Sequence, residues 1–182
     1  MAKLVSQTYG EALFEVAMEE QKADLFLNEA QEILTILEQN PELDKLMKHP
    51  KISRQEKEQV LDNIFQTSLS REMTGFLKLL VNKERYGELP NIFEYLINRI
   101  KEEKKIGVAF VTTAVELTAE KKEAIKKRLL ETTSYKTMEM HYEVEEAIIG
   151  GMIIRIGDRV VDSSVRTKLE EMKKQLLQIQ LG

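Results

Sequence analysis

The side chains that come closest to a catalytic arrangement are two histidines and a pair of aspartates. His49 and His141 could act as bases or metal ligands, but they lie in different parts of the chain. Neither has a second histidine or a cysteine near it in the sequence, as a zinc site requires. Asp158 and Asp162 are close enough in sequence to form a carboxylate pair for acid–base chemistry. A hairpin turn and a helix cap account for both aspartates without catalysis, so we expect no active site.

Gly150, Gly151 and Gly157 are the glycines that could approach a phosphate group. Their spacing matches neither the dinucleotide-binding fingerprint nor the P-loop, and no helix begins at the distance that either motif requires. The sequence has no cysteine, which excludes disulfides, thiolate metal sites and cysteine nucleophiles. We therefore expect no cofactor, no metal and no enzymatic activity.

Residues 1–105 have the pattern of successive helices. Leucine, glutamate, lysine and glutamine dominate over glycine and proline, and such straight-chain residues lose little rotamer freedom in a helix. Breaks fall at Asn40-Pro41, His49-Pro50 and Tyr86-Gly87. Helix starts are predicted at Asp24, at Ser53, which forms a capping box with Glu56, and at Ser70. Together these signals predict five full helices and one short helix. Because the connections are short, neighbouring helices should run antiparallel, and we expect a six-helix antiparallel bundle.

Residues 106–182 have a different pattern. Short β-branched or alternating runs predict strands at 108–115, 138–144, 152–156 and 159–161, with a two-residue hairpin at Gly157-Asp158. Helices are expected at 118–133 and from about 164 to 178. This predicts a small α/β domain with a short mixed sheet and a C-terminal amphipathic helix. The whole chain is thus expected to be α+β, with domains at 1–105 and 106–182.

Charge and hydropathy limit the possible partners. The 27 basic and 31 acidic residues are interleaved, with a net charge of −4, so no broad positive field faces nucleic acid. The basic stretch from Lys121 to Arg128 leaves nucleic-acid binding as a third hypothesis, which predicts salt-sensitive retention on a polyanion. No apolar run approaches the roughly 20 residues needed to span a bilayer, and the acidic amino-terminal stretch does not resemble a signal peptide. We expect no direct membrane insertion.

Two predicted helices are apolar over an unusually wide arc. At 100° per residue the first helix is apolar over roughly 240°, more than a surface helix needs to face a core. Its apolar residues are Val5, Tyr9, Ala12, Leu13, Phe14, Val16, Ala17 and Met18. The helix from Ser70 to Lys83 has the same character, through Met73, Phe76, Leu77, Leu79, Leu80 and Val81. Two such helices side by side could share a groove for a partner helix, or both could be central helices covered on all sides.

The terminal helix carries a narrower apolar seam. The seam repeats at three- and four-residue intervals through Val165, Leu169, Met172, Leu176 and Ile179. It has charged borders. It could pack on the sheet of its own domain or on a helix of another chain.

The stretch AIIGGMIIRIGDRVVDSSVRTKLEEM, from Ala147 to Met172, strongly resembles the carboxy-terminal signature of the delta subunit family of bacterial F-type ATP synthases. This family is related to the mitochondrial oligomycin-sensitivity-conferring protein. YGEALFEVA, from Tyr9 to Ala17, is similar to the family's first helix, and FLKLLVNKERYGELPNI, from Phe76 to Ile92, to its fifth helix and following turn. The sequence departs from the family pattern at Gly10, where alanine is usual, and at Ser163, where glycine is common.

The resemblance implies specific partners and residues. The first and fifth helices would receive the amino-terminal helix of an alpha subunit of the catalytic head, and the second domain would hold the b subunits of the peripheral stalk. The expected groove residues are Tyr9, Ala12, Leu13, Val16, Phe76, Leu79 and Leu80. The family-motif residues of the second domain are Gly151, Arg155, Gly157, Asp158, Asp162, Ser164, Val165 and Arg166.

By the same resemblance, the protein is a non-catalytic stator component that ties the catalytic head to the peripheral stalk during proton-coupled ATP synthesis. It would be monomeric alone, present once per complex, and attached through that complex to the cytoplasmic face of the bacterial plasma membrane. The alternative is a general helix-binding adaptor unrelated to rotary synthesis.

Overall fold

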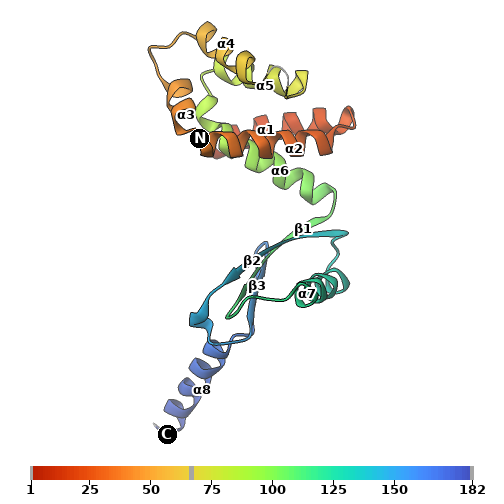
Figure 1. The fold of residues 1–182 in the computed structure, drawn as a ribbon, viewed down its shortest axis with the longest axis vertical. Coiled ribbons are helices and arrows are strands. Elements are labelled where there is room, and N and C mark those ends of the chain that lie inside the picture. The colour runs from red at the N-terminus through yellow and green to blue at the C-terminus, as the bar shows by residue number, and fades with distance from the viewer. Residues whose placement is uncertain (1, 66–67, 181–182) are drawn as a thin grey trace. The chain divides into compact units, whose positions relative to one another are not determined.

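The computed structural model describes residues 2–65 and 68–180, and side chains at 4–65 and 68–178. The chain divides into two compact units, residues 1–100 and 101–182 (Figure 1). The sequence pattern placed the border near residue 105. The helix at this border, α6, runs from Leu89 to Glu103, so the division falls within its last turn. Each unit is described by itself below.

The first unit is built from helices. They are α1 (Ala2–Glu19), α2 (Ala23–Gln39), α3 (Pro41–Lys48), α4 (Arg54–Phe65), α5 (Arg71–Asn82), the 3-10 turn η1 (Tyr86–Glu88) and α6. Side-chain caps fix two of the starts. The backbone N–H of Ser53 donates to Glu56 (2.9 Å) and that of Glu56 to the Ser53 hydroxyl (3.2 Å), a reciprocal capping box that opens α4. The Ser70 hydroxyl accepts from the N–H of Met73 (3.2 Å) and opens α5.

The core of the first unit draws on all its helices. Phe26 of α2, Phe65 of α4 and Phe93 of α6 are almost completely buried, together with Met73 and Leu77 of α5. One carboxylate, Glu29 of α2, is also buried. It accepts hydrogen bonds from the backbone N–H and the hydroxyl of Ser70, so its burial leaves no unsatisfied polar group and ties α2 to the start of α5.

The second unit is a four-stranded mixed sheet with two helices. Its strands are β1 (Ile106–Thr113), β2 (Thr137–Val144), β3 (Met152–Ile156) and β4 (Arg159–Asp162), in the order β2-β1-β3-β4. Strand β1 is parallel to β2 and antiparallel to β3, and β3 and β4 form a hairpin. The helices are α7 (Ala119–Thr132) and α8 (Val165–Gln180), and η2 (Glu146–Ile148) is a short 3-10 turn. This confirms the α+β class and the mixed sheet.

Strand β1 begins and ends two positions earlier than its sequence pattern predicts, because parallel pairing with β2 fixes its limits. Ile106 pairs with Thr137 and Thr113 with Val144, the last residue of β2. Val115, expected inside the strand, lies beyond the paired region and is 68% exposed. Ala109, Val111 and Thr113 are buried on one face of the sheet, whereas Phe110 on the other face is 42% exposed.

Candidate partner-binding surfaces

The two helices with wide apolar arcs touch through their aromatic rings. The rings of Tyr9 on α1 and Phe76 on α5 meet edge to face, with centroids 6.4 Å apart. Phe76 in turn lies 6.2 Å from the ring of Phe93 on α6. A geometry of this kind adds about 0.5–1.5 kcal/mol beyond the area buried. The contact therefore brings α1 and α5 together along one side of the first unit.

The predicted groove residues separate into three levels of burial. Val16 and Leu79 are 36% and 43% exposed, and Ala12 is also exposed. Tyr9 and Phe76 are half-buried and packed against the core cluster. We call these five residues the α1–α5 surface. They present apolar side chains on two touching helices, the arrangement that an amphipathic partner helix requires.

Leu13 and Leu80 are exceptions among the expected groove residues. They are 4% and 0% exposed and belong to the hydrophobic core. The apolar arc of each helix is wide because part of it faces inward, and these two leucines lie on that inward part. They hold α1 and α5 onto the core. The prediction that these two leucines line an open groove is therefore wrong.

Charged and aromatic neighbours border α1. Lys22, just after the helix, forms ion pairs with Glu20 (2.6 Å) and with Glu72 at the start of α5 (2.9 Å). Hydrogen bonds with Glu20 and Glu72 raise the pKa of the Lys22 ammonium. The hydrogen bond with Lys22 also lowers the pKa of the Glu72 carboxyl. On another side, the Tyr95 hydroxyl of α6 donates to Glu11 (2.7 Å).

Gly10 allows this close approach of α6. A Cβ at Gly10 would overlap the ring of Tyr95, so the glycine at this position matches an aromatic neighbour that the sequence pattern did not reveal. The ring of Tyr95 therefore accounts for a glycine here, although glycine in a helix costs about 0.5–1 kcal/mol relative to alanine.

Three of the family-motif residues of the second unit fix the start of α8: Gly151, Asp162 and Ser164. Gly151 has a φ of +76°, and a Cβ there would overlap the carbonyl oxygen of Ser163. Asp162 accepts from the N–H of Ser164 (2.8 Å) and from the hydroxyl of Thr167 (2.7 Å). Ser164 is 1% exposed, and its hydroxyl accepts from the N–H of Thr167 (3.2 Å). These contacts lower the pKa of the Asp162 carboxyl, the hydrogen bond from the Ser164 N–H most of all.

The other motif residues complete the hairpin and begin the helix. The guanidinium of Arg155 lies 4.6 Å from the ring centroid of Phe110, on the exposed face of the sheet. Gly157 has a φ of +55° in the β3–β4 turn, beside the exposed Asp158. Val165 and Arg166 are the first residues of α8 and are exposed. Part of the motif thus supports the start of α8, and the rest lies on the exposed face of the sheet and in the hairpin turn.

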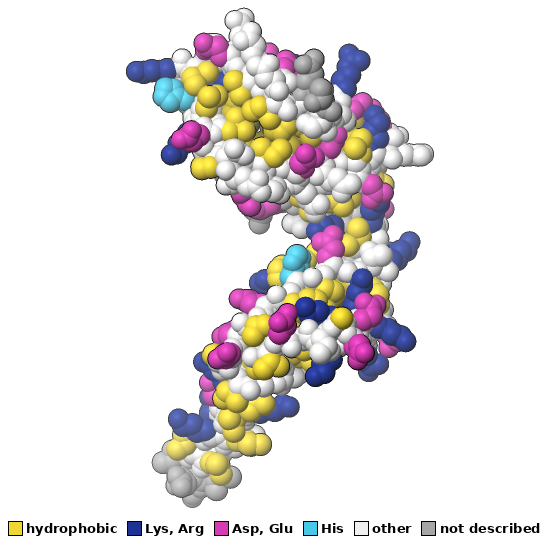
Figure 2. All heavy atoms as spheres, viewed as in Figure 1, with side chains coloured by type: hydrophobic (Ala, Val, Ile, Leu, Met, Phe, Trp, Pro, Cys, Tyr) yellow, Lys and Arg dark blue, Asp and Glu magenta, His cyan; other side chains and the backbone are white. Residues whose placement is uncertain are grey.

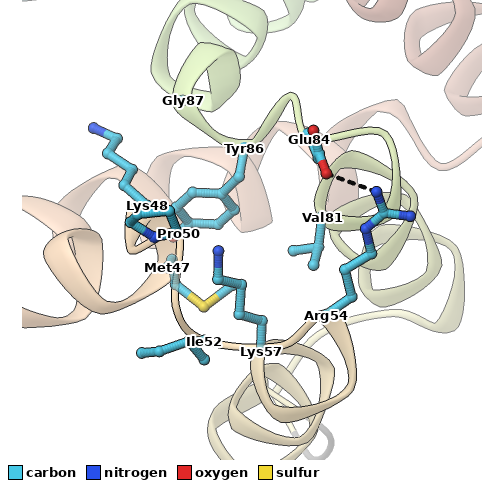
Figure 3. A pocket seen from close by; sticks show the side chains of 10 residues that line it. All are labelled: Met47, Lys48, Pro50, Ile52, Arg54, Lys57, Val81, Glu84, Tyr86 and Gly87. Atoms are coloured by element: carbon cyan, nitrogen blue, oxygen red, sulfur yellow. Dashed lines mark hydrogen bonds and ion pairs between the residues drawn. The ribbon is translucent and has the colours of Figure 1, made fainter.

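A cavity of about 380 Å³ lies beside α3, the start of α4 and η1. Figure 3 shows the side chains of Lys57 and Tyr86 directed into it. Its edge is closed by an ion pair between Arg54 and Glu84 (2.6 Å), which lowers the pKa of Glu84. Burial raises the pKa of the Tyr86 hydroxyl. The lining residues provide no nucleophile next to a base, and within 2–65 and 68–180 no cluster of acidic residues and histidines could hold a metal.

The apolar seam of α8, which its spacing allows to pack either on its own sheet or on another chain, is largely exposed. Val165, Leu169, Met172 and Leu176 are 37%, 52%, 59% and 65% exposed, so the seam does not pack on its own sheet. The side chain of Ile179, the last expected member, lies outside those described. Figure 2 shows hydrophobic side chains following one another along α8 with lysine and arginine beside them. The sequence shows the three- and four-residue spacing of the seam, but it does not show that no other part of the unit covers these side chains.

Exposed apolar side chains on the helical unit and on the α/β unit are typical of the class of structural proteins that bind other chains. A family model described as ATP synthase delta (OSCP) subunit matches residues 5–176. ATP synthase subunit delta of Lachnoclostridium phytofermentans is 50% identical over the full length of both chains. The same subunit of Alkaliphilus metalliredigens is 33% identical, over 98% of this chain and 99% of its own.

The chain belongs to the ATP synthase delta (OSCP) family. It is a non-catalytic, structural component of the peripheral stalk of an F-type ATP synthase, which removes the alternative of an unrelated helix-binding adaptor. A chain of the Toxoplasma gondii mitochondrial ATP synthase hexamer shares the fold, with a TM-score of 0.76 and 19% identity over 94% of this chain and 97% of its own. Within the described residues, no helix is both long and apolar enough to cross a bilayer.

Proposed function

We propose that the α1–α5 surface binds the amino-terminal amphipathic helix of an alpha subunit of the catalytic head. The observation that supports this most directly is the exposure of Val16 and Leu79 on two helices joined by the Tyr9–Phe76 contact. A partner helix laid against these residues would remove apolar surface from water, at about 25 cal/mol per Å² before the costs of association.

The second unit is proposed to hold the carboxy-terminal ends of the b subunits. Its motif residues anchor α8 firmly at one end, while the rest of that helix exposes apolar side chains. The six helices of the first unit are proposed to act as one antiparallel bundle. Their shared core, which includes residues of α1, α2, α4, α5 and α6, would pass a load on the α1–α5 surface to the whole unit.

The mechanical role follows from having two binding sites on one chain. Rotation of the central shaft exerts torque on the catalytic head, which would turn with the shaft unless it were anchored. A chain bound to both the head and the stalk raises the effective concentration of each contact for the other. One copy, monomeric before assembly, would suffice at the cytoplasmic face of the bacterial plasma membrane.

Calorimetry with a synthetic peptide of the alpha-subunit amino-terminal helix tests the head-binding site. We expect saturable binding by the full chain, and at least a hundredfold loss for Val16→Asp, since a charge would be buried against the peptide. Val115→Asp, at a site 68% exposed in the second unit, is the matched control and should bind normally. Unchanged affinity of Val16→Asp, with helicity preserved in both variants, would refute the site.

A further inference from the structure

The apolar seam of α8 has the spacing of a coiled coil. Val165, Leu169, Met172 and Leu176 follow one another at intervals of four, three and four residues, and we call them the α8 strip. This corresponds to the d, a, d and a positions of successive heptads. All four are exposed, increasingly so toward the end of the helix. A surface helix that only covered its own domain would bury such a stripe.

The positions that border the strip carry positive charge. In the same register Arg166 and Lys173 occupy e positions and Lys168 a g position, and the remaining e and g positions, at 175 and 180, are glutamines. The acidic residues of the helix lie away from the seam, Glu170 at b and Glu171 at c. Arg166 is compensated in part by Glu170, 3.2 Å away. The residues that would face a partner's e and g positions are therefore basic or neutral.

The start of the helix is held in place before any partner binds. Asp162 and Ser164 cap its first turn, the N–H of Val165 donates to the carbonyl of Gly150 (2.9 Å), and a Cβ at Gly150 would come within 3.1 Å of the Val165 side chain. A binding element that is already ordered loses less conformational entropy on association.

We propose that the α8 strip pairs with a partner helix in a two-stranded coiled coil, and that the partner carries leucine-type residues at a and d and acidic residues at e and g. The proposal rests on the stalk contact of the second unit proposed above, since it names the chemistry of the chain that this unit would hold. It assigns Lys168 and Lys173 to partner selection and the α8 strip to affinity.

The charges at the e and g positions favour an acidic partner helix over a second copy of this chain. In a parallel pair, a g residue faces the e residue five positions later on the other helix, so Lys168 of each copy would face Lys173 of the other. An antiparallel pair sets e against e and g against g, where the residues are again lysine, arginine or glutamine. Neither arrangement of two α8 helices places an acidic residue opposite these lysine and arginine side chains. A partner helix with acidic residues at e and g would pair with them.

The experiment uses the full-length, isotope-labelled chain and two designed helical peptides. Both peptides have the same leucine-type a and d residues over four heptads, and they differ only in glutamate or lysine at e and g. Amide shifts should map the glutamate peptide to α8, with affinity roughly tenfold or more above that of the lysine peptide at low salt. The double variant Lys168→Glu/Lys173→Glu should reverse this preference. Lys174→Glu, at an f position on the far side of the helix, should not.

Three results would overturn the proposal: equal binding of both peptides, shifts located outside α8, or self-association of the chain that Leu169→Asp abolishes. Binding of the wild-type chain to vesicles with anionic lipid, with no binding of either peptide, would also overturn it in favour of a membrane-surface helix. Binding of isolated b subunits to the chain distinguishes failure of this inference from failure of the proposed stalk contact. If they bind wild type and Leu169→Asp equally, the stalk contact lies elsewhere and only this inference fails; if they bind neither, the proposed stalk contact itself fails.

Discussion

Tyr9 and Phe76 meet at 67° between their ring planes, and this edge-to-face contact joins two helices that are distant in the sequence. Val16 lies two turns beyond Tyr9 on the same side of α1, and Leu79 follows Phe76 by about one turn on α5. The aromatic contact thus joins the two helices that carry these exposed apolar residues. Both partners of the contact are half-buried, so it serves the fold and the surface together.

A double-mutant cycle should reveal the energy of this contact. We expect Tyr9→Leu and Phe76→Leu each to destabilise the first unit, with a coupling of about 1 kcal/mol between them. Urea unfolding followed by circular dichroism, with the double variant included, measures it. Strict additivity would mean that the rings contribute only through the area they bury.

Adjacent leucines on α5 should respond differently to the same substitution. Leu80→Asp places a carboxylate at a fully buried position and should lower the free energy of unfolding by about 4 kcal/mol or more. Leu79→Asp, at a position 43% exposed, should cost less than about 1 kcal/mol while weakening binding of the alpha-subunit peptide. Chemical denaturation and calorimetry on the same two variants check this pair. Equal destabilisation would contradict the inward orientation of Leu80.

Gly151 should be intolerant of any side chain. Its φ is +76° and the Ser163 carbonyl stands where a Cβ would be, so Gly151→Ala should cost about 1–3 kcal/mol and loosen the start of α8. Gly87→Ala is the control, because no atom lies within 4 Å of the Cβ that it would add. Amide hydrogen exchange should show faster exchange at residues 165–168 in the first variant alone.

Acid should weaken the cap of α8. The pKa of Asp162 is lower in the folded chain than its ordinary value of 3.8. Its stabilising contribution is therefore complete above that ordinary value, and it disappears as the pH falls through the lower, folded value. Amide shifts of Ser164 and Thr167 followed from neutral to acidic pH should report the loss. Asp162→Asn should show weaker protection at neutral pH and no such titration.

The local pattern of the sequence predicted most elements, because capping residues, prolines and hydrophobic periodicity act over a few positions. The Ser53–Glu56 capping box is confirmed by reciprocal hydrogen bonds. The strand that begins at Ile106 was predicted two residues late, since its limits depend on pairing with β2, which follows about 30 residues later. The glycine at position 10 has no local explanation, because the ring of Tyr95, where its Cβ would be, comes from a helix about 85 residues later in the chain.

The sequence by itself determined the α+β class, the helical and strand segments, the glycine-rich signature of the family and the heptad spacing on α8. Each of these depends on neighbouring residues. Only the tertiary structure decided that Leu13 and Leu80 are core while Val16 and Leu79 are open, and that the α8 strip has no cover. The burial of a side chain depends on which distant segments pack against its helix. A wide apolar arc on one helix therefore cannot show which of its side chains face the core and which stay exposed.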